Sequence, residues 1–123
     1  MTGPVQPVGA PLGRVMTPAW LADEMARIAG IVVPDPYIVV DPCCGHGALL
    51  EAALRRFPEA PVTGIDVDPE ARGLALHRAG TTRVPQSGDY LQWDDSSRAH
   101  LSSVYLINPP YDDVGWRILA KAV

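Results

Sequence analysis

The stretch that decides the fold is Val39-Val40-Asp41-Pro42-Cys43-Cys44-Gly45-His46-Gly47. It opens within a short apolar, β-branched run over residues 37–40, which is typical of a buried strand. An acidic residue ends that run, and a turn with two glycines follows it. Residues 48–57 then carry apolar side chains at helical spacing. The stretch therefore predicts a strand, a sharp turn and a helix in direct succession.

The same succession recurs along the chain. Residues 62–65 form a second apolar run, residues 104–107 form another, and residues 82–84 are a weaker candidate strand. Asp68 and Pro69 are typical of a helix start, and this helix extends to about residue 79. A last helix is predicted over residues 116–123. Strands that alternate with helices predict an open α/β sheet of about four mainly parallel strands.

A further helix is predicted upstream of the deciding stretch. Thr17 offers a capping hydroxyl, and Pro18 has no N–H to lose at the first helical position. Apolar residues follow at helical spacing, and Gly30 is the expected stop. Before this helix, residues 1–16 are rich in glycine and proline and predict an extended arm. We therefore expect an arm over 1–16 and one domain over 17–123.

Polar residues end the predicted strands, at Asp41, Asp66 and Asn108. In open parallel sheets, ligands bind at the carboxyl ends of the strands. An acid after a strand can instead simply cap the next helix, and this is the interpretation we adopt for Asp68. For Asp41 and Asp66, which flank a Gly-x-Gly turn, a ligand site is the better interpretation.

The glycine turn limits which ligand can bind. A dinucleotide fingerprint needs a third glycine, whereas Leu50 stands at that position, and the acid at Asp41 would repel a pyrophosphate. Asp66 lies 19 residues beyond Gly47, where an acid typically accepts hydrogen bonds from ribose hydroxyls. The ligand should therefore carry a ribose and a cation but no diphosphate, and S-adenosylmethionine meets these requirements.

The turn also resembles a known family. Asp-Pro-x-x-Gly-x-Gly from Asp41 to Gly47 resembles motif I of the class I S-adenosylmethionine-dependent methyltransferases, and residues 64–68 and 88–91 resemble motifs II and III. Thr17-Pro18 resembles motif X, which precedes motif I in the gamma group of amino-methyltransferases, many of them N6-adenine DNA restriction-modification enzymes. The resemblance spans residues 14–112 and implies a partial Rossmann-like class I methyltransferase sheet.

The resemblance implies roles for individual residues toward the cofactor. Thr17 would contact its methionine end, and Asp41, with the turn residues, would shape the methionine pocket. Asp66 would accept hydrogen bonds from the ribose hydroxyls. Val67 would pack on the adenine ring, Asp89 would accept from its amino group, and Tyr90 would form an apolar wall beside it. The full set of cofactor residues implied in this way is Thr17, Asp41, Pro42, Cys43, Gly45, Gly47, Asp66, Val67, Asp89 and Tyr90.

The predicted catalytic motif is Asn108-Pro109-Pro110-Tyr111. The exocyclic amine of adenine is a poor nucleophile because its lone pair is delocalised into the ring. Two acceptors, the Asn108 side-chain oxygen and the Pro109 carbonyl, would favour a pyramidal nitrogen, and proline keeps the turn stiff. Tyr111 offers a face for a stacked base. An adenine inside a duplex must flip out to reach such a site.

The motif alone does not define the substrate. Similar motifs occur in methyltransferases that act on protein glutamine and on RNA guanine, so RNA or protein N-methylation is one alternative to DNA adenine methylation. An inactive methyltransferase-like interaction module is another. The upstream helix with Thr17-Pro18 favours the DNA group.

Composition restricts the partners. The 123 residues carry a net charge of −4, and Arg55-Arg56 is the only adjacent basic pair. DNA binding usually needs a basic face, so DNA contact would come through a target-recognition region not in this chain. The two adjacent cysteines and three scattered histidines offer no disulfide or metal-ligand spacing, so no metal is expected. Without a visible membrane span or signal peptide, a cytoplasmic location is expected.

The number of strands suggests an incomplete catalytic domain. The complete fold of the family has seven strands, and this chain ends soon after the catalytic motif. The predicted strand at residues 104–107 would lie at an open sheet edge, which is prone to pair with another chain. We therefore expect a homodimer or a second protein chain at this edge, and little activity from the chain alone.

Overall fold

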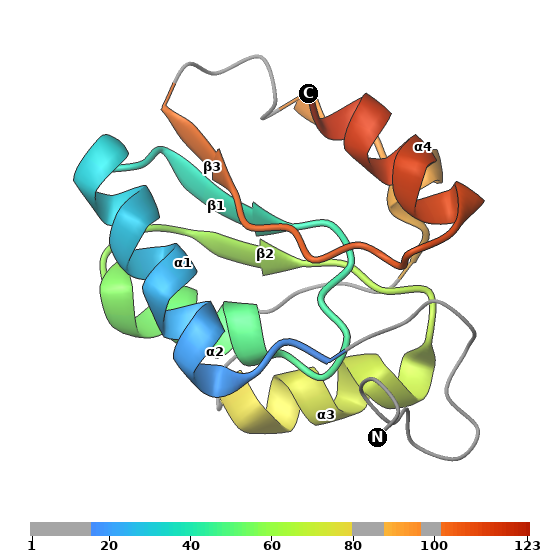
Figure 1. Ribbon diagram of the computed structural model, residues 1–123, viewed down its shortest axis with the longest axis horizontal. Coiled ribbons are helices and arrows are strands. Elements are labelled where there is room, and N and C mark those ends of the chain that lie inside the picture. Colours follow the sequence, from blue (N-terminus) through green and yellow to red (C-terminus); the bar gives the residue numbers. More distant parts are fainter. Residues whose placement is uncertain (1–15, 80–87, 97–101) are drawn as a thin grey trace, which may run out of the picture.

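The computed structural model describes residues 16–79, 88–96 and 102–123. Its centre is a sheet of three parallel strands in these residues, ordered β2-β1-β3 (Figure 1). The strands are β1 (Ile38–Asp41), β2 (Val62–Gly64) and β3 (Ser103–Tyr105). Val39 of β1 pairs with Val62 on one side and Val104 on the other. The predicted parallel α/β sheet is confirmed, with three strands described where about four were expected.

Successive strand residues point to opposite faces of the sheet, and both faces of β1 are apolar. Helices therefore cover both faces. Val39 packs with residues of α1 (Ala19–Val32), α2 (Ala48–Arg56) and α3 (Pro69–Ala79), which lie together in Figure 1. Val40 packs on the other face with Tyr90 of the short 3-10 helix η1 (Tyr90–Gln92) and Ile118 of α4 (Asp113–Ala122). One buried core on each face thus holds β1 in the middle of the molecule.

A partly buried polar cluster connects α4 to η1. Lys121 of α4 donates to the backbone carbonyls of Tyr90 and Trp93, and its ammonium lies 4.5 Å from the centre of the Tyr90 ring. The carboxylate of Asp95 accepts from the hydroxyl of Tyr90 at 2.6 Å and from that of Tyr105 in β3. These bonds fix α4 relative to β3, and the predicted catalytic motif lies between these two elements.

The first helix departs from prediction at both ends. Its N-cap residue is Pro18, no side chain caps it, and the Thr17 hydroxyl is engaged elsewhere. The helix continues through Gly30 to Val32, so the predicted stop at Gly30 is wrong. Gly30 is instead buried within the helix, beside the guanidinium end of the flexible Arg56 side chain of α2.

The other elements mostly follow prediction. Helices α2 and α3 are confirmed, and Asp68 accepts from the backbone N–H of Glu70 at the start of α3. The last helix begins three residues before the predicted 116, because Asp112 caps it by accepting from the N–H of Gly115 at 3.1 Å. The predicted strand at 104–107 is shorter and begins one residue earlier. The candidate strand at 82–84 and residues 1–15 of the arm lie outside the described residues.

Strand β3 lies at an edge of the described sheet, as predicted for the strand at residues 104–107. Within the same residues, no helix has the length and apolar character needed to cross a membrane.

Candidate active site at the strand ends

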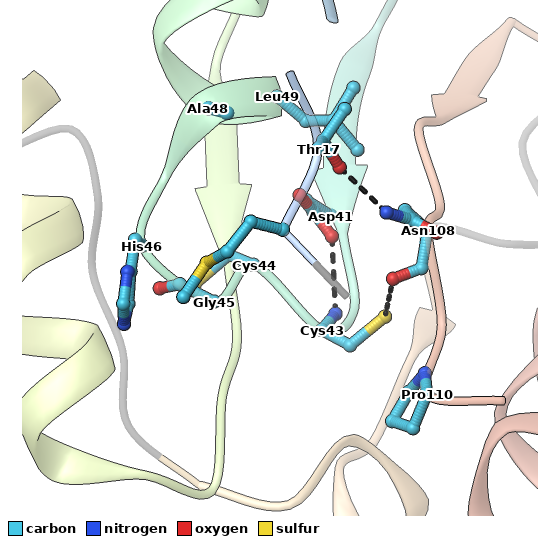
Figure 2. Close-up of a pocket in the computed structure, with 11 residues that line it drawn as sticks. Thr17, Asp41, Cys43, Cys44, Gly45, His46, Ala48, Leu49, Asn108 and Pro110 are labelled. Atoms are coloured by element: carbon cyan, nitrogen blue, oxygen red, sulfur yellow. Dashed lines mark hydrogen bonds between the residues drawn. The ribbon is translucent and has the colours of Figure 1, made fainter. Parts of the chain in front are cut away.

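A pocket of about 230 Å³ opens where β1 and β3 end (Figure 2). Three segments far apart in the sequence form it: the residues before α1, the glycine turn after β1, and the predicted catalytic motif after β3. Its lining residues are Met16, Thr17, Asp41, Cys43, Cys44, Gly45, His46, Ala48, Leu49, Asn108 and Pro110. The pocket thus joins parts of the predicted cofactor site and catalytic site in one space.

The glycine turn needs its glycines for backbone reasons. Gly45 and Gly47 have φ angles of +53° and +94°, a region that other residues rarely adopt. A Cβ on Gly47 would also lie 2.9 Å from the Cα of Ala75 in α3. The turn therefore packs closely on α3 while its backbone borders the pocket at Gly45.

Asp66 holds this turn in place. One carboxylate oxygen accepts from the backbone N–H of Gly45 at 2.8 Å, and the other accepts from that of Asp68 at 2.9 Å. The side chain is buried and is not among the pocket-lining residues. Its predicted contact with ribose hydroxyls stays a prediction.

Asp41 is the strongest candidate for binding a cation. It lines the pocket although its side chain is only 2% exposed. One carboxylate oxygen accepts from the backbone N–H of Cys43 at 3.2 Å, whereas the other, Oδ2, has no hydrogen-bond partner among the described residues. Burial raises the pKa of Asp41 to about 7; the Cys43 N–H lowers it, and the nearby charge of Asp66 raises it further. An unpaired buried oxygen favours a ligand that donates to it.

Asn108 is held from two sides. Its Nδ2 donates to the hydroxyl of Thr17 at 2.8 Å, as Figure 2 shows, and its Oδ1 accepts from the hydroxyl of Tyr111 at 3.0 Å. The Asn108 carbonyl also accepts from the Cys43 thiol at 3.7 Å. The side chain therefore presents its nitrogen to the helix start and its oxygen toward the exposed Tyr111.

The first turn of α4 supports the same loop. A Cβ on Gly115 would lie 1.8 Å from the carbonyl oxygen of Pro110, so only glycine fits against that peptide. Since Asp112 caps the helix immediately after the motif, the loop from Asn108 to α4 is short and braced at its far end.

The residues predicted to hold the adenosine half of a cofactor do not line this pocket. Val67 is 63% exposed, and Asp89 accepts from the N–H of Leu91 as the cap of η1. Tyr90 is buried in the core beside Val40. Their roles toward an adenine ring stay predictions. The described pocket corresponds to the predicted methionine end and the catalytic asparagine.

Several lining residues had no assigned role from sequence. Met16, Cys44, His46, Ala48 and Leu49 border the pocket. Each lies within a few residues of Thr17 or of the glycine turn, and this adjacency is the signal that could have identified them. Among the described residues, no three potential metal ligands come together.

No family model matches the chain. Among curated relatives, it is 32% identical over 91 residues to an uncharacterised protein of Mycoplasma pneumoniae, covering 74% of this chain and 18% of that protein. It is 32% identical over 85 residues to a tRNA1(Val) (adenine(37)-N6)-methyltransferase of Vibrio cholerae, covering 65% and 34%. It is 45% identical over 49 residues to the type II restriction enzyme and methyltransferase RM.BcgI of Heyndrickxia coagulans, covering 40% and 7%. The chain thus spans about a third or less of these relatives.

Solved structures also match the fold, two of them over more than four fifths of the chain. A proposed RNA methyltransferase from Pyrococcus horikoshii superposes with a TM-score of 0.73 at 22% identity, covering 90% of this chain and 57% of that one. The chain has the class I methyltransferase fold. The plantazolicin methyltransferase BpumL, solved with S-adenosylhomocysteine, matches with a TM-score of 0.59 at 21% identity, covering 83% and 40%. The amino pentose methyltransferase CalS10 of Micromonospora echinaspora, solved with S-adenosylmethionine, matches at 0.51 and 33% identity, covering 61% and 30%.

Proposed function

We propose that this chain binds S-adenosylmethionine and helps to transfer its methyl group to the N6 amine of adenine in a nucleic acid, with DNA as the first candidate. The main support is that Thr17, Asp41 and Asn108, from three separate segments, line one pocket. A cofactor group at Asp41 and an amine at Asn108 would then be neighbours.

The residues of the pocket fit the amino-acid end of this cofactor. Its ammonium group is a cation with several N–H donors, and the unpaired, buried Oδ2 of Asp41 lacks such a donor among the described residues. The backbone at Gly45, which carries no side chain, lets a ligand approach the turn closely. When bound, S-adenosylmethionine supplies an electrophilic methyl group on a positively charged sulfur.

The chain's own residues would prepare the amine. Asn108 Oδ1 and the Pro109 carbonyl accept its two N–H bonds and so keep its lone pair out of the ring. Oδ1 already accepts from Tyr111, and a carbonyl oxygen has two lone pairs with which to accept. The amine loses one proton on methylation, and since a neutral amide cannot take up that proton, it leaves to water. Tyr111, 66% exposed, offers its ring to the flipped base.

DNA and RNA are both supported as the nucleic acid. The position of Thr17 upstream of the glycine turn, and the similarity to a restriction-modification enzyme, favour DNA. The similarity to a tRNA adenine-N6 methyltransferase supports RNA as much as the restriction-modification enzyme supports DNA, so the position of Thr17 is what makes DNA the first candidate. Protein glutamine has no support from these relatives. Since the net charge is −4, we propose that substrate contact needs a recognition region from outside this chain.

Transfer of tritium from labelled S-adenosylmethionine tests the proposal. Because little activity is expected from the chain alone, it is used in molar excess over each substrate. It is incubated separately with unmethylated DNA, unmodified tRNA and a glutamine-containing peptide, and the products are digested and separated. Label in N6-methyladenosine or its deoxy form supports the proposal and identifies the substrate. Label only in the peptide, or equal label from Asn108→Ala, would contradict it.

We further propose that a second copy of the chain, or another protein, covers the edge of β3, which is an outer strand of the described sheet. Sedimentation equilibrium at micromolar concentration tests self-association. If the chain sediments as a monomer, a second protein is the remaining possibility. Fractions of a cell extract are then added to the tritium assay to find one that stimulates methyl transfer.

A further inference from the structure

Thr17 and Asn108 are 91 residues apart in sequence, yet their side chains form a direct hydrogen bond (Figure 2). Thr17 lies just before α1, and its oxygen accepts from Asn108 Nδ2 at 2.8 Å. Both residues line the pocket that also contains Asp41. The hydroxyl is therefore placed between the predicted cofactor and the predicted catalytic amide.

The orientation of the Asn108 amide matters for the proposed reaction. With Oδ1 toward the substrate, the side chain accepts an N–H of the amine, whereas a reversed amide would set its own N–H groups against that amine. A free hydroxyl does not select one orientation, because it can either donate or accept. The hydroxyl of Tyr111, on the other side of the amide, is equally ambiguous.

A negatively charged group in the pocket would remove this ambiguity. If the Thr17 hydroxyl donates its proton to an anion, its oxygen can only accept, and the Asn108 amide must then turn Nδ2 toward it. An amino acid carries its carboxylate on the same carbon as its ammonium. A ligand whose ammonium meets Asp41 therefore brings a carboxylate into the space that Thr17 also lines.

We infer that Thr17 is a positioning residue that couples cofactor binding to catalysis: the cofactor carboxylate orients the Thr17 hydroxyl, which in turn fixes Asn108 with its oxygen toward the substrate. The inference rests on the proposed function. It explains why a residue before α1 and a residue after β3 share one hydrogen bond at the site.

The chain makes a direct test possible, because Asn108 is its only asparagine. Protein labelled with 15N at asparagine side chains gives one amide pair in a two-dimensional NMR spectrum. S-adenosylhomocysteine, which has the amino-acid group but no methyl to transfer, is compared with 5′-methylthioadenosine, which lacks that group. We expect S-adenosylhomocysteine alone to slow solvent exchange of the Asn108 amide proton that Thr17 accepts, by about tenfold, because it would stabilise this hydrogen bond by excluding the reversed amide.

Two variants separate the hydroxyl from the rest of the side chain. Thr17→Val keeps the shape and should lose the exchange protection, whereas Thr17→Ser keeps the hydroxyl and should retain it. In the tritium assay at saturating cofactor, Thr17→Val should lower kcat by about tenfold and Thr17→Ser by less than about twofold. If Thr17→Val folds poorly, Thr17→Ala serves in the same comparison.

Two results would overturn the inference: equal protection in Thr17→Val and wild type, or equal effects of the two ligands when both bind. Failure of the proposed function gives a different pattern. In that case S-adenosylhomocysteine does not bind, or wild type in excess over the substrate transfers no methyl group although the Asn108 signals respond to Thr17 as expected.

Discussion

Replacing Asp41 by asparagine should stabilise the protein while weakening its cofactor binding. The change is nearly isosteric, and the remaining oxygen can still accept from the N–H of Cys43. It removes a charge that is 2% exposed and has one oxygen without a partner among the described residues. Such a charge is unfavourable for folding unless a ligand pairs with it.

The magnitude follows from the pKa of Asp41. Burial raises this pKa from 3.8 to about 7. Between these two pH values the folded chain keeps the proton on Asp41, whereas the unfolded chain has released it. Stability from this group is therefore fully present below pH 4 and is lost as the pH rises through 7. A shift of this size corresponds to at most roughly 4 kcal/mol at pH 8.

The new amide N–H of Asp41→Asn must itself find a partner, at a cost of about 1–3 kcal/mol. We therefore expect a net gain of about 1–3 kcal/mol in the free energy of unfolding at pH 8, and no gain at pH 4. Urea denaturation followed by circular dichroism at both pH values measures it, with the exposed carboxylate variant Asp35→Asn as control. The S-adenosylmethionine affinity should fall at least about tenfold at pH 8, as expected for loss of a buried charged partner. A variant that is less stable at pH 8, or that binds the cofactor as well as wild type, would refute the reasoning.

The remaining predictions concern pH, packing and the catalytic loop. Cofactor affinity of the wild type should rise between pH 6 and pH 8 as Asp41 ionises, and a pH-independent affinity by fluorescence titration would argue against its role. Gly115→Ala should destabilise the fold by about 2 kcal/mol or more, because the new Cβ would meet the Pro110 carbonyl. Gly73→Ala, which has open space around it in α3, should stabilise the fold by about 0.5–1 kcal/mol. Thermal melts compare the two variants, and equal changes in stability would contradict the packing argument. Tyr111→Phe should keep most of the methyl transfer, because the ring remains. Tyr111→Ala should lower kcat/KM at least about tenfold, as expected for lost base stacking. Similar kcat/KM values for the two variants would exclude stacking. Asn108→Ala should lower transfer by more than about a hundredfold while changing cofactor affinity by less than about threefold, and a parallel loss of both would assign Asn108 to binding.

Local signals in the sequence predicted the centre of the fold well. The β-branched run before Asp41 and the positive-φ glycines after it define the strand and turn with little help from the rest of the chain. Asp68 predicted the start of α3 for the same reason, because a cap is a contact over two residues. The joining of the glycine turn with Asn108 in one pocket followed from the rule that ligands bind at strand ends.

The features that were missed depend on distant partners. Thr17 has the sequence of a helix cap, but its hydroxyl bonds to Asn108, far along the chain. Gly30 has the sequence of a helix stop, but the helix continues through it to Val32, and it is buried beside the guanidinium of Arg56. The start of α4 is different, since Asp112 is a recognisable capping residue whose signal was present in the sequence.

The most direct test of the central claim is a calorimetric titration of the chain with S-adenosylmethionine at pH 8. We predict saturable one-to-one binding, strongly weakened in Asp41→Asn and unchanged in Asp35→Asn. A folded sample that releases no heat of binding and fails to retain the cofactor in equilibrium dialysis would contradict the assignment of the pocket.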